Sequence, residues 1–181
     1  MTLKKSLILG IAGTGLAVLL YADSTWFTDG PGTTDDKLVA LANIQPGLGT
    51  VMIEYSNRFT NTYYAAQAGN WGMAAYQLKE MPEIQEVAET TRPGRKDALQ
   101  GFEFSALTAL AKDIVNQDIT GFNADFKTAT AFCNGCHQAT GFGYILYSLP
   151  DKPPAPVTMK VDMKFTADQL SSILSALLGG N

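Results

Sequence analysis

The stretch FNADFKTATAFCNGCH, residues 122–137, decides the fold, because a helical apolar pattern runs directly into the most specific motif of the chain. Its apolar side chains recur at steps of three and four and therefore share one face of a predicted helix: Phe122, Phe126, Ala129, Cys133 and Cys136. Thr120 or Asn123 is expected to cap the N-terminus of this helix.

The motif is Cys133-Asn134-Gly135-Cys136-His137, which matches the C-x-x-C-H pattern of covalent haem attachment. Thiols at positions i and i+3 project from the same helix face, so both can form thioethers to the two vinyl groups of one porphyrin. The histidine one residue later can then bind the iron. The motif therefore predicts one covalently bound haem c, with Cys133 and Cys136 as attachment sites and His137 as an iron ligand.

Two other readings of the motif lack their supporting parts. A structural zinc site normally needs four protein ligands, and the chain holds only two cysteines and one histidine, all within this motif. A thiol–disulfide redox pair would sit beside a βαβ pattern, and the sequence has no sustained strand alternation.

The sixth iron ligand decides what such a haem can do. His137 is the sole histidine, so bis-histidine ligation within the chain is excluded. Met52, on the apolar stripe of the first predicted helix, is the main candidate, although helix-stripe methionines often only fill cores. Met159 and Met163 follow a proline-rich stretch and could fold back over the iron, and an open site is a further alternative.

The apolar periodicity predicts an all-α fold in which four helices form a bundle and the haem motif lies on the fourth. The first helix is expected from Pro46 to about Gly69, and the second begins after the cap Asn70. Pro82 is expected to kink or break the second helix. The third is expected over residues 97–117.

Aromatic and cationic side chains are available to surround a porphyrin, although aromatic residues at helical spacing also fill cores. The candidates for the wall of the haem site are Tyr55, Phe59 and Phe126, with Tyr63, Tyr64 and Trp71 as further aromatics. Candidates for pairing with the propionates are Arg58, Arg92, Arg95 and Lys127. Tyr144 and Tyr147 are expected to cover an edge of the haem.

The N-terminus is predicted to be an export signal or a membrane anchor. Lys4 and Lys5 precede an apolar run from Leu7 to Ala22 without charge. Cleavage and retention both remain open, because the run is near the lower length limit for a membrane span and Tyr21 is large for a cleavage site. Residues 23–45 are expected to be a linker.

The charge of the chain restricts its partners. The formal net charge is −4, and because Lys4 and Lys5 add two positive charges to the first 22 residues, residues 23–181 carry −6. A field of that sign repels nucleic-acid phosphates and favours a basic protein partner. Nucleic-acid binding is therefore not expected.

After the predicted bundle, residues 46–142, the pattern changes. Gly143 and the prolines at 150, 153, 154 and 156 favour an extended tail over residues 143–181, which we expect to wrap the bundle without joining it. Thr166 with Gln169 resembles a capping box and predicts a short helix that ends at Gly179-Gly180.

The arrangement resembles the class II c-type cytochromes, the cytochrome c′ group, in which a four-helix bundle carries C-x-x-C-H on its last helix. The resemblance covers about residues 46–142. It implies that the first helix supplies either a methionine to the iron, here Met52, or a side chain that leaves the site open. The chain departs from this group by the 44 residues after His137, by the proline-rich tail and by the membrane segment, and these departures weigh against gas binding.

Together these observations predict a monohaem c-type cytochrome that carries single electrons between redox proteins and is not an enzyme. It is expected on the periplasmic side of the bacterial inner membrane, anchored or released. The alternatives are a gas-binding haem protein with an open sixth position and a haem subunit of a larger membrane redox complex.

Overall fold

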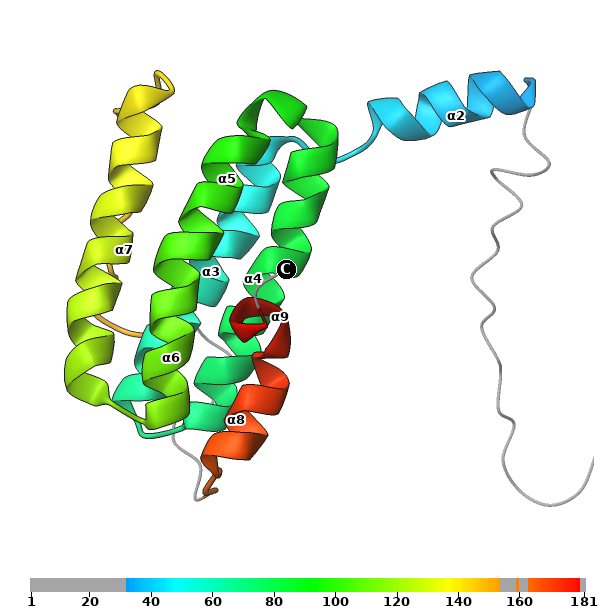
Figure 1. Ribbon diagram of the computed structural model, residues 1–181. Helices are drawn as coiled ribbons and strands as arrows, with labels where there is room; N and C mark the ends of the chain where they lie inside the picture. Colours follow the sequence, from blue (N-terminus) through cyan, green and yellow to red (C-terminus); the bar gives the residue numbers. More distant parts are fainter. Residues whose placement is uncertain (1–31, 154–158, 160–162, 180–181) are drawn as a thin grey trace, which may run out of the picture. The chain divides into compact units, whose positions relative to one another are not determined.

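The computed structural model describes residues 32–153, 159 and 163–179, and over these residues the secondary structure is helical, with no strand. The predicted all-α class is therefore confirmed. The chain divides into two units, residues 1–44 and 45–181. All residues that line the candidate site belong to the second unit, whose helices run from cyan to red in Figure 1.

The first unit contains α2 (Thr34–Asn43), which lies within the segment expected to be a linker. A capping box explains its start: the Thr33 hydroxyl accepts from the Asp36 backbone N–H at 3.2 Å, and the Asp36 carboxylate accepts from the Thr33 backbone N–H at 2.8 Å. The pKa of Asp36 is lowered because its carboxylate accepts from the Thr33 backbone N–H and also from the Thr33 hydroxyl, at 2.7 Å. No residue of α2 is buried.

The export or anchor segment predicted at residues 1–22 lies outside the described residues. Residues 23–31 of the expected linker also lie outside them. None of the helices in the described part of the chain has the length and apolar character needed to span a bilayer.

The second unit begins with α3 (Leu48–Gln67) and α4 (Trp71–Thr91), which pack along each other. Asn70 caps α4 as predicted, since its side chain accepts from the Met73 backbone N–H at 3.1 Å. A kink or a break was expected at Pro82, and the break does not occur, because the helix runs on through this residue. The turn between the helices uses Gly69 at a φ of +74°, a left-handed conformation that favours glycine.

The third helical segment is built from two α-helices joined by a wider turn. It comprises α5 (Lys96–Phe102), the π-helical turn η2 (Glu103–Leu107) and α6 (Thr108–Asn116), and it follows a short 3₁₀ turn, η1 (Pro93–Arg95). The apolar periodicity predicted the position of this segment. It did not predict the π-helical turn, because one extra residue in a turn hardly changes a pattern of steps of three and four. Such π-helical turns are rare and recur at functional sites.

The fourth segment is α7 (Ile119–Ala139), which carries the motif on its last turns. The predicted caps Thr120 and Asn123 were wrong, because Asp118 is the N-cap and its carboxylate accepts from the backbone N–H groups of Thr120 and Gly121 at 3.0 and 3.1 Å. The preceding Gln117 has a φ of 53° and ends α6, so the chain reverses in the space of two residues.

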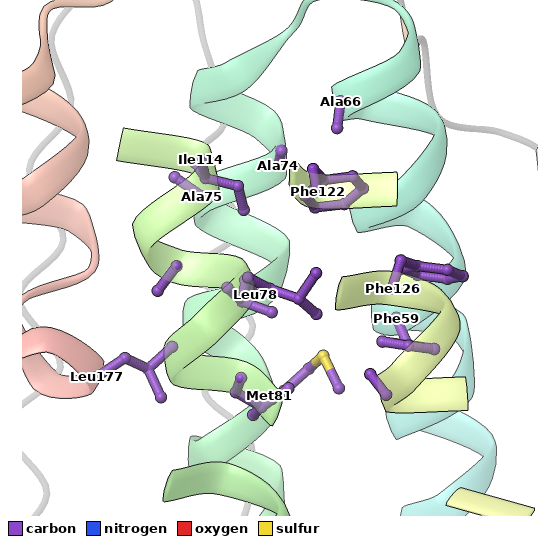
Figure 2. Packing of buried hydrophobic residues seen from close by; sticks show 14 of the residues in the cluster. Phe59, Ala66, Ala74, Ala75, Leu78, Met81, Ile114, Phe122, Phe126 and Leu177 are labelled. Atoms are coloured by element: carbon purple, nitrogen blue, oxygen red, sulfur yellow. The ribbon is translucent and has the colours of Figure 1, made fainter. Parts of the chain in front are cut away.

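The core fills the space between α3, α4, α6 and α7, and Figure 2 shows Leu78 and Met81 of α4 near its centre. Phe59 of α3 stacks on Phe126 of α7, with ring centroids 4.2 Å apart. Small residues on α3 and α4 (Ala65, Ala66, Ala74 and Ala75) let the helices approach closely, and all four are buried.

The C-terminal tail differs from expectation. Thr166 and Gln169 form the predicted capping box at the start of α8 (Ala167–Ile173). However, α8 packs against α4 and α6, and α9 (Ser175–Leu178) packs against α6 and η2. Leu170, Leu174 and Leu177 are buried in the common core, so the prediction that the tail stays outside the helical core was wrong. Their spacing of three and four residues is the reason: it places an apolar stripe on one face of even a short helix.

The docking of the tail can be tested at Gly72 of α4. A Cβ atom at this position would lie 2.1 Å from Cζ of Phe165, directly before α8. We expect Gly72→Ala to lower the free energy of unfolding by about 1–3 kcal/mol through overpacking, measured by urea denaturation. Gly101→Ala is the matched control, because its added Cβ meets nothing within 4 Å in α5 and removes a helix-weakening glycine. If Gly72→Ala were as stable as this control, the docked position of Phe165 would be wrong.

Candidate functional site

Cys133, Cys136 and His137 line one pocket of about 640 Å³. All three belong to the last turns of α7, which ends at Thr140 and leads into Gly141 at a φ of +88°. Both cysteines are free thiols and are partly buried. The spacing of i and i+3 therefore brings both cysteines to the wall of the same pocket.

Four parts of the chain form the pocket: α3 from Leu48 to Thr60, Arg95 together with α5, the end of α7, and the segment after the motif. Apart from the motif, the pocket is lined mainly by apolar and aromatic side chains, among them Leu48, Met52, Tyr55, Leu99, Phe102, Phe132, Phe142, Ile145, Leu146 and Tyr147. A concave, mostly apolar site of about 300–1,000 Å³ with a few convergent polar groups is typical for a cofactor.

The imidazole of His137 is fixed from outside the motif. Its Nδ1 lies 2.8 Å from the backbone carbonyl oxygen of Ile145, and that oxygen can only accept. The proton of a neutral ring must therefore be on Nδ1, which leaves Nε2 with its lone pair available as a ligand. The backbone N–H of Phe142 in turn donates to the carbonyl of His137 at 2.7 Å. The bond to Ile145 orients the ring, as second-shell bonds do in metal sites, and the bond to Phe142 fixes the backbone at the end of α7.

We call residues 142–150 the strap, because they run from the end of α7 to α3. Asn134, inside the motif, holds it: its Nδ2 donates to the Tyr147 carbonyl at 3.1 Å and its Oδ1 accepts from the Tyr147 backbone N–H at 2.7 Å. On the α3 side, the hydroxyl groups of Tyr147 and Thr60 are 3.0 Å apart, and the Tyr64 hydroxyl donates to the Pro150 carbonyl. Burial raises the pKa of Tyr147 to about 12, so its hydroxyl stays neutral.

The structure brings together some of the predicted site residues and separates others. Met52 and Tyr55 both line the pocket. Phe59 and Phe126 do not line it, and instead stack on each other in the adjacent core.

The two methionines of the tail are placed elsewhere. Met159 is buried in the core, where its carbonyl accepts from Asn70 Nδ2 at 3.1 Å, and Met163 is exposed. Neither lines the pocket, whereas Met52 does. Among the candidates for a second iron ligand, the geometry therefore favours Met52.

Of the four cations considered for a propionate, Arg95 lines the pocket. Arg58 is engaged elsewhere: it forms an ion pair with Glu54 at 2.8 Å and donates to Gln77 at 3.1 Å. Arg92 and Lys127 are exposed and are not part of the pocket wall. Tyr147 lies on the wall as predicted for a residue that covers the site, while Tyr144 is 80% exposed and does not.

Sequence reasoning missed two groups of residues: those that fix the backbone around the motif, and two apolar residues of the pocket wall. The carbonyl of Ile145 carries no sequence signal, because any residue offers one. Asn134 occupies a variable position of the motif, but a side chain with both a donor and an acceptor, next to a segment rich in Gly and Pro, could have suggested that it pairs with backbone. Phe132 and Leu99 lie outside the haem-facing pattern that the motif suggested.

Among the described residues, the motif included, no three side chains of His, Cys, Asp or Glu cluster in a way that could hold a metal ion on their own. Comparison of the chain with protein-family models, with curated proteins and with solved structures found no match. The function must therefore be argued from the pocket itself.

The two thiols can be probed directly in protein that lacks a cofactor. Burial and, to a lesser extent, the nearby Cys136 together raise the pKa of Cys133 from 9.0 to about 12. Since the thiolate is the reactive form, the thiolate fraction of Cys133 at pH 8 falls roughly a thousandfold. We expect iodoacetamide to alkylate Cys133 at least a hundredfold more slowly in the folded chain than in urea, measured in Cys136→Ala by mass spectrometry. Equal rates, in protein whose helicity is verified by circular dichroism, would contradict the buried position of this thiol.

Proposed function

We propose that this protein is a monohaem c-type cytochrome that transfers single electrons between redox proteins outside the cytoplasm. One haem c would be bound through thioethers to Cys133 and Cys136, with His137 as one axial ligand and Met52 as the other. The observation that carries the proposal is that both thiols, the imidazole and Met52 line the same apolar pocket.

The residues present suit such a group in three respects. The volume of about 640 Å³ falls in the range of cofactor sites, roughly 300–1,000 Å³. The donor set of two thiols, one imidazole and one thioether matches the chemistry of covalent haem with His and Met ligation. Finally, the bond from Nδ1 of His137 to the Ile145 carbonyl leaves Nε2 available for iron.

The helix order also supports the finer architecture that we propose, a class II cytochrome bundle made of α3, α4, the segment from α5 to α6, and α7. The motif falls on the last of these helices and Met52 on the first. The chain would differ from that group by the strap and by the docked helices α8 and α9. Because Met52 lines the pocket, we propose that the sixth position is taken by this protein ligand and not by a gas.

A bound haem would supply a one-electron couple, and the chain would tune it. The apolar wall excludes water and lowers the local dielectric, while the Ile145 carbonyl makes the His137 imidazole a better donor to a metal. Arg95 is placed to compensate a carboxylate at the pocket wall. Phe142, Ile145 and Leu146 line the pocket and are 41%, 48% and 68% exposed, which gives a partner protein a route to the edge of the cofactor.

We further propose that residues 1–22 direct the protein to the periplasmic side of the bacterial inner membrane, as a cleaved signal or a retained anchor. The acidic net charge favours a redox partner with a basic surface. No role in nucleic-acid binding and no enzyme activity are proposed.

The decisive experiment is a visible absorption spectrum of the exported full chain, oxidised and reduced, with and without CO. The proposal expects a low-spin spectrum that CO does not change. A high-spin ferrous spectrum with rapid CO uptake would instead support a gas-binding protein with an open sixth position. Co-purification in a stable membrane assembly would support a subunit of a larger redox complex. A colourless preparation, whose thiols react fully after denaturation, would refute all three.

The role of Met52 can be tested by replacing it with leucine, which keeps the volume but removes the sulfur. We expect Met52→Leu to convert the spectrum to high-spin, to allow CO binding and to lower the midpoint potential, because a methionine ligand raises it. Met73→Leu is the control, since Met73 packs against the core and does not line the pocket. A low-spin, CO-insensitive Met52→Leu protein would assign the sixth position to another group.

The covalent attachment can be tested at the second cysteine. We expect Cys136→Ala to abolish double attachment, because only one thiol then remains for two vinyl groups. The pyridine haemochrome spectrum should shift toward that of a haem with one free vinyl group. An unchanged spectrum together with an unchanged haem-protein mass, apart from the lost sulfur, would rule out attachment at Cys136.

A further inference from the structure

A chain of hydrogen bonds leads from the pocket wall to a pair of carboxylates. The Tyr55 hydroxyl, on a buried side chain that lines the pocket, donates to Gln85 Oε1 at 3.0 Å. Gln85 lies on α4 and is 0% exposed. Its Nε2 donates to Glu89 Oε1 at 2.9 Å and to Glu103 Oε2 at 2.8 Å. One buried amide therefore bridges the pocket wall and two carboxylates from different helices.

This carboxylate pair is held by amides and not by cations. Gln100 Nε2 donates to the second oxygen of Glu89 at 3.0 Å. Neither Glu89 nor Glu103 has a salt bridge in the part of the chain that the structure describes. Two carboxylates that share one donor repel each other, and the pair can relieve the repulsion by binding one proton.

The environment of Glu103 agrees with this. Burial raises the pKa of Glu103 above its ordinary value, and the charges of Glu89 and, more weakly, Glu86 raise it further, against the opposing effect of Gln85. Both acidic neighbours come from α4. Helices α5, α6 and α7 also pack against η2, and α9 does so without carrying a titratable residue. The titratable residues of the first three are Lys96, Asp97, Lys112, Asp113, Asp125, Lys127, Cys133, Cys136 and His137, and none of them is a hydrogen-bond or ion-pair partner of Glu103.

We propose that reduction of a haem in this pocket is coupled to the uptake of one proton by the Glu89–Glu103 pair, through Tyr55 and Gln85. The proposal rests on the proposed function. The iron gains one electron from a reduced partner protein, so the pocket loses one positive charge. A carboxylate near the pocket is then less stable in its charged form and takes a proton from solvent. When the electron leaves to an oxidised partner, the proton is released again.

The hydrogen-bonded chain from Tyr55 through Gln85 connects the charge in the pocket to the two carboxylates. Charge in the pocket acts on the Tyr55 hydroxyl, whose dipole is aligned with the Gln85 amide, and the amide presents its N–H groups to both carboxylates. Such aligned bonds polarise one another in a low-dielectric interior. Since reduction binds a proton, the midpoint potential must fall as the pH rises through the range in which the pair titrates. For Glu103 that range lies above the ordinary pKa of glutamate.

The test is the pH dependence of the midpoint potential of the full haem-loaded chain, from about pH 4 to 8, a range that spans ordinary and raised glutamate pKa values. We expect the potential of the wild type to fall with pH in this window, and Glu103→Gln to reduce the slope at least twofold. Glu89→Gln/Glu103→Gln should remove the carboxylate contribution. The control is Glu83→Gln, an exposed residue paired with Lys79 on α4, which should keep the wild-type slope. Any haem propionates titrate in all variants, so they cancel in the comparison.

Tyr55→Phe tests the connection separately, because it leaves the carboxylates in place and removes only the hydroxyl that links them to the pocket. We expect the slope to fall at least twofold here as well. Proton uptake on reduction, measured with a pH indicator in lightly buffered solution, should decrease in parallel. Equal slopes and equal proton uptake in the wild type and the double glutamine variant would overturn the inference while leaving the proposed function intact. A preparation without haem would overturn both.

Discussion

The stacking of Phe59 on Phe126 sets the distance between the two helices on which the site depends. Phe59 belongs to α3, which carries Met52, and Phe126 belongs to α7, which carries the motif two turns further on. Both rings are buried, and their centroids lie 4.2 Å apart. Because cores are close-packed, this contact leaves little freedom in the separation of the helices, and the pocket beyond it inherits a fixed width.

The strap packs on the same aromatic pair and connects it to the histidine of the motif. Phe59 also meets the ring of Tyr147, with centroids 5.2 Å apart, so the strap packs on the same aromatic pair that spaces the helices. Asn134 then fixes the backbone of Tyr147, and two residues earlier the Ile145 carbonyl meets His137. The core, the strap and the orientation of the imidazole are therefore linked in one chain of contacts. A change in the core near Phe59 would reach the histidine through the strap, without touching the motif.

Much of this could be predicted from the sequence. Periodicity placed the helices, and the spacing of Cys133, Cys136 and His137 placed the site, because both depend on local geometry along one helix. The roles of Phe59 and Phe126 could not be predicted, since wall and core residues share the same stripe and only the packing of α3 on α7 separates them. The docking of α8 was missed because it depends on contacts with α4 across about one hundred residues. The π-helical turn and the carbonyl of Ile145 leave no mark in the sequence at all.

A carboxylate of a bound group and the carboxylates of Glu89 and Glu103 would differ in their partners, because the first would lie near a cation and the other two lie near amides. Arg95 lies at the pocket wall, where a permanent positive charge would keep a carboxylate of a bound group ionised over the whole physiological range. Beneath Tyr55 the partners of Glu89 and Glu103 are the neutral amides of Gln85 and Gln100. An amide donates hydrogen bonds to a partly buried carboxylate without adding a positive charge that would hold it ionised. A small change in the local electrostatic potential can therefore change its protonation. Had a lysine or arginine stood in place of Gln85, the same carboxylates would be held ionised and could not respond to the charge of the pocket.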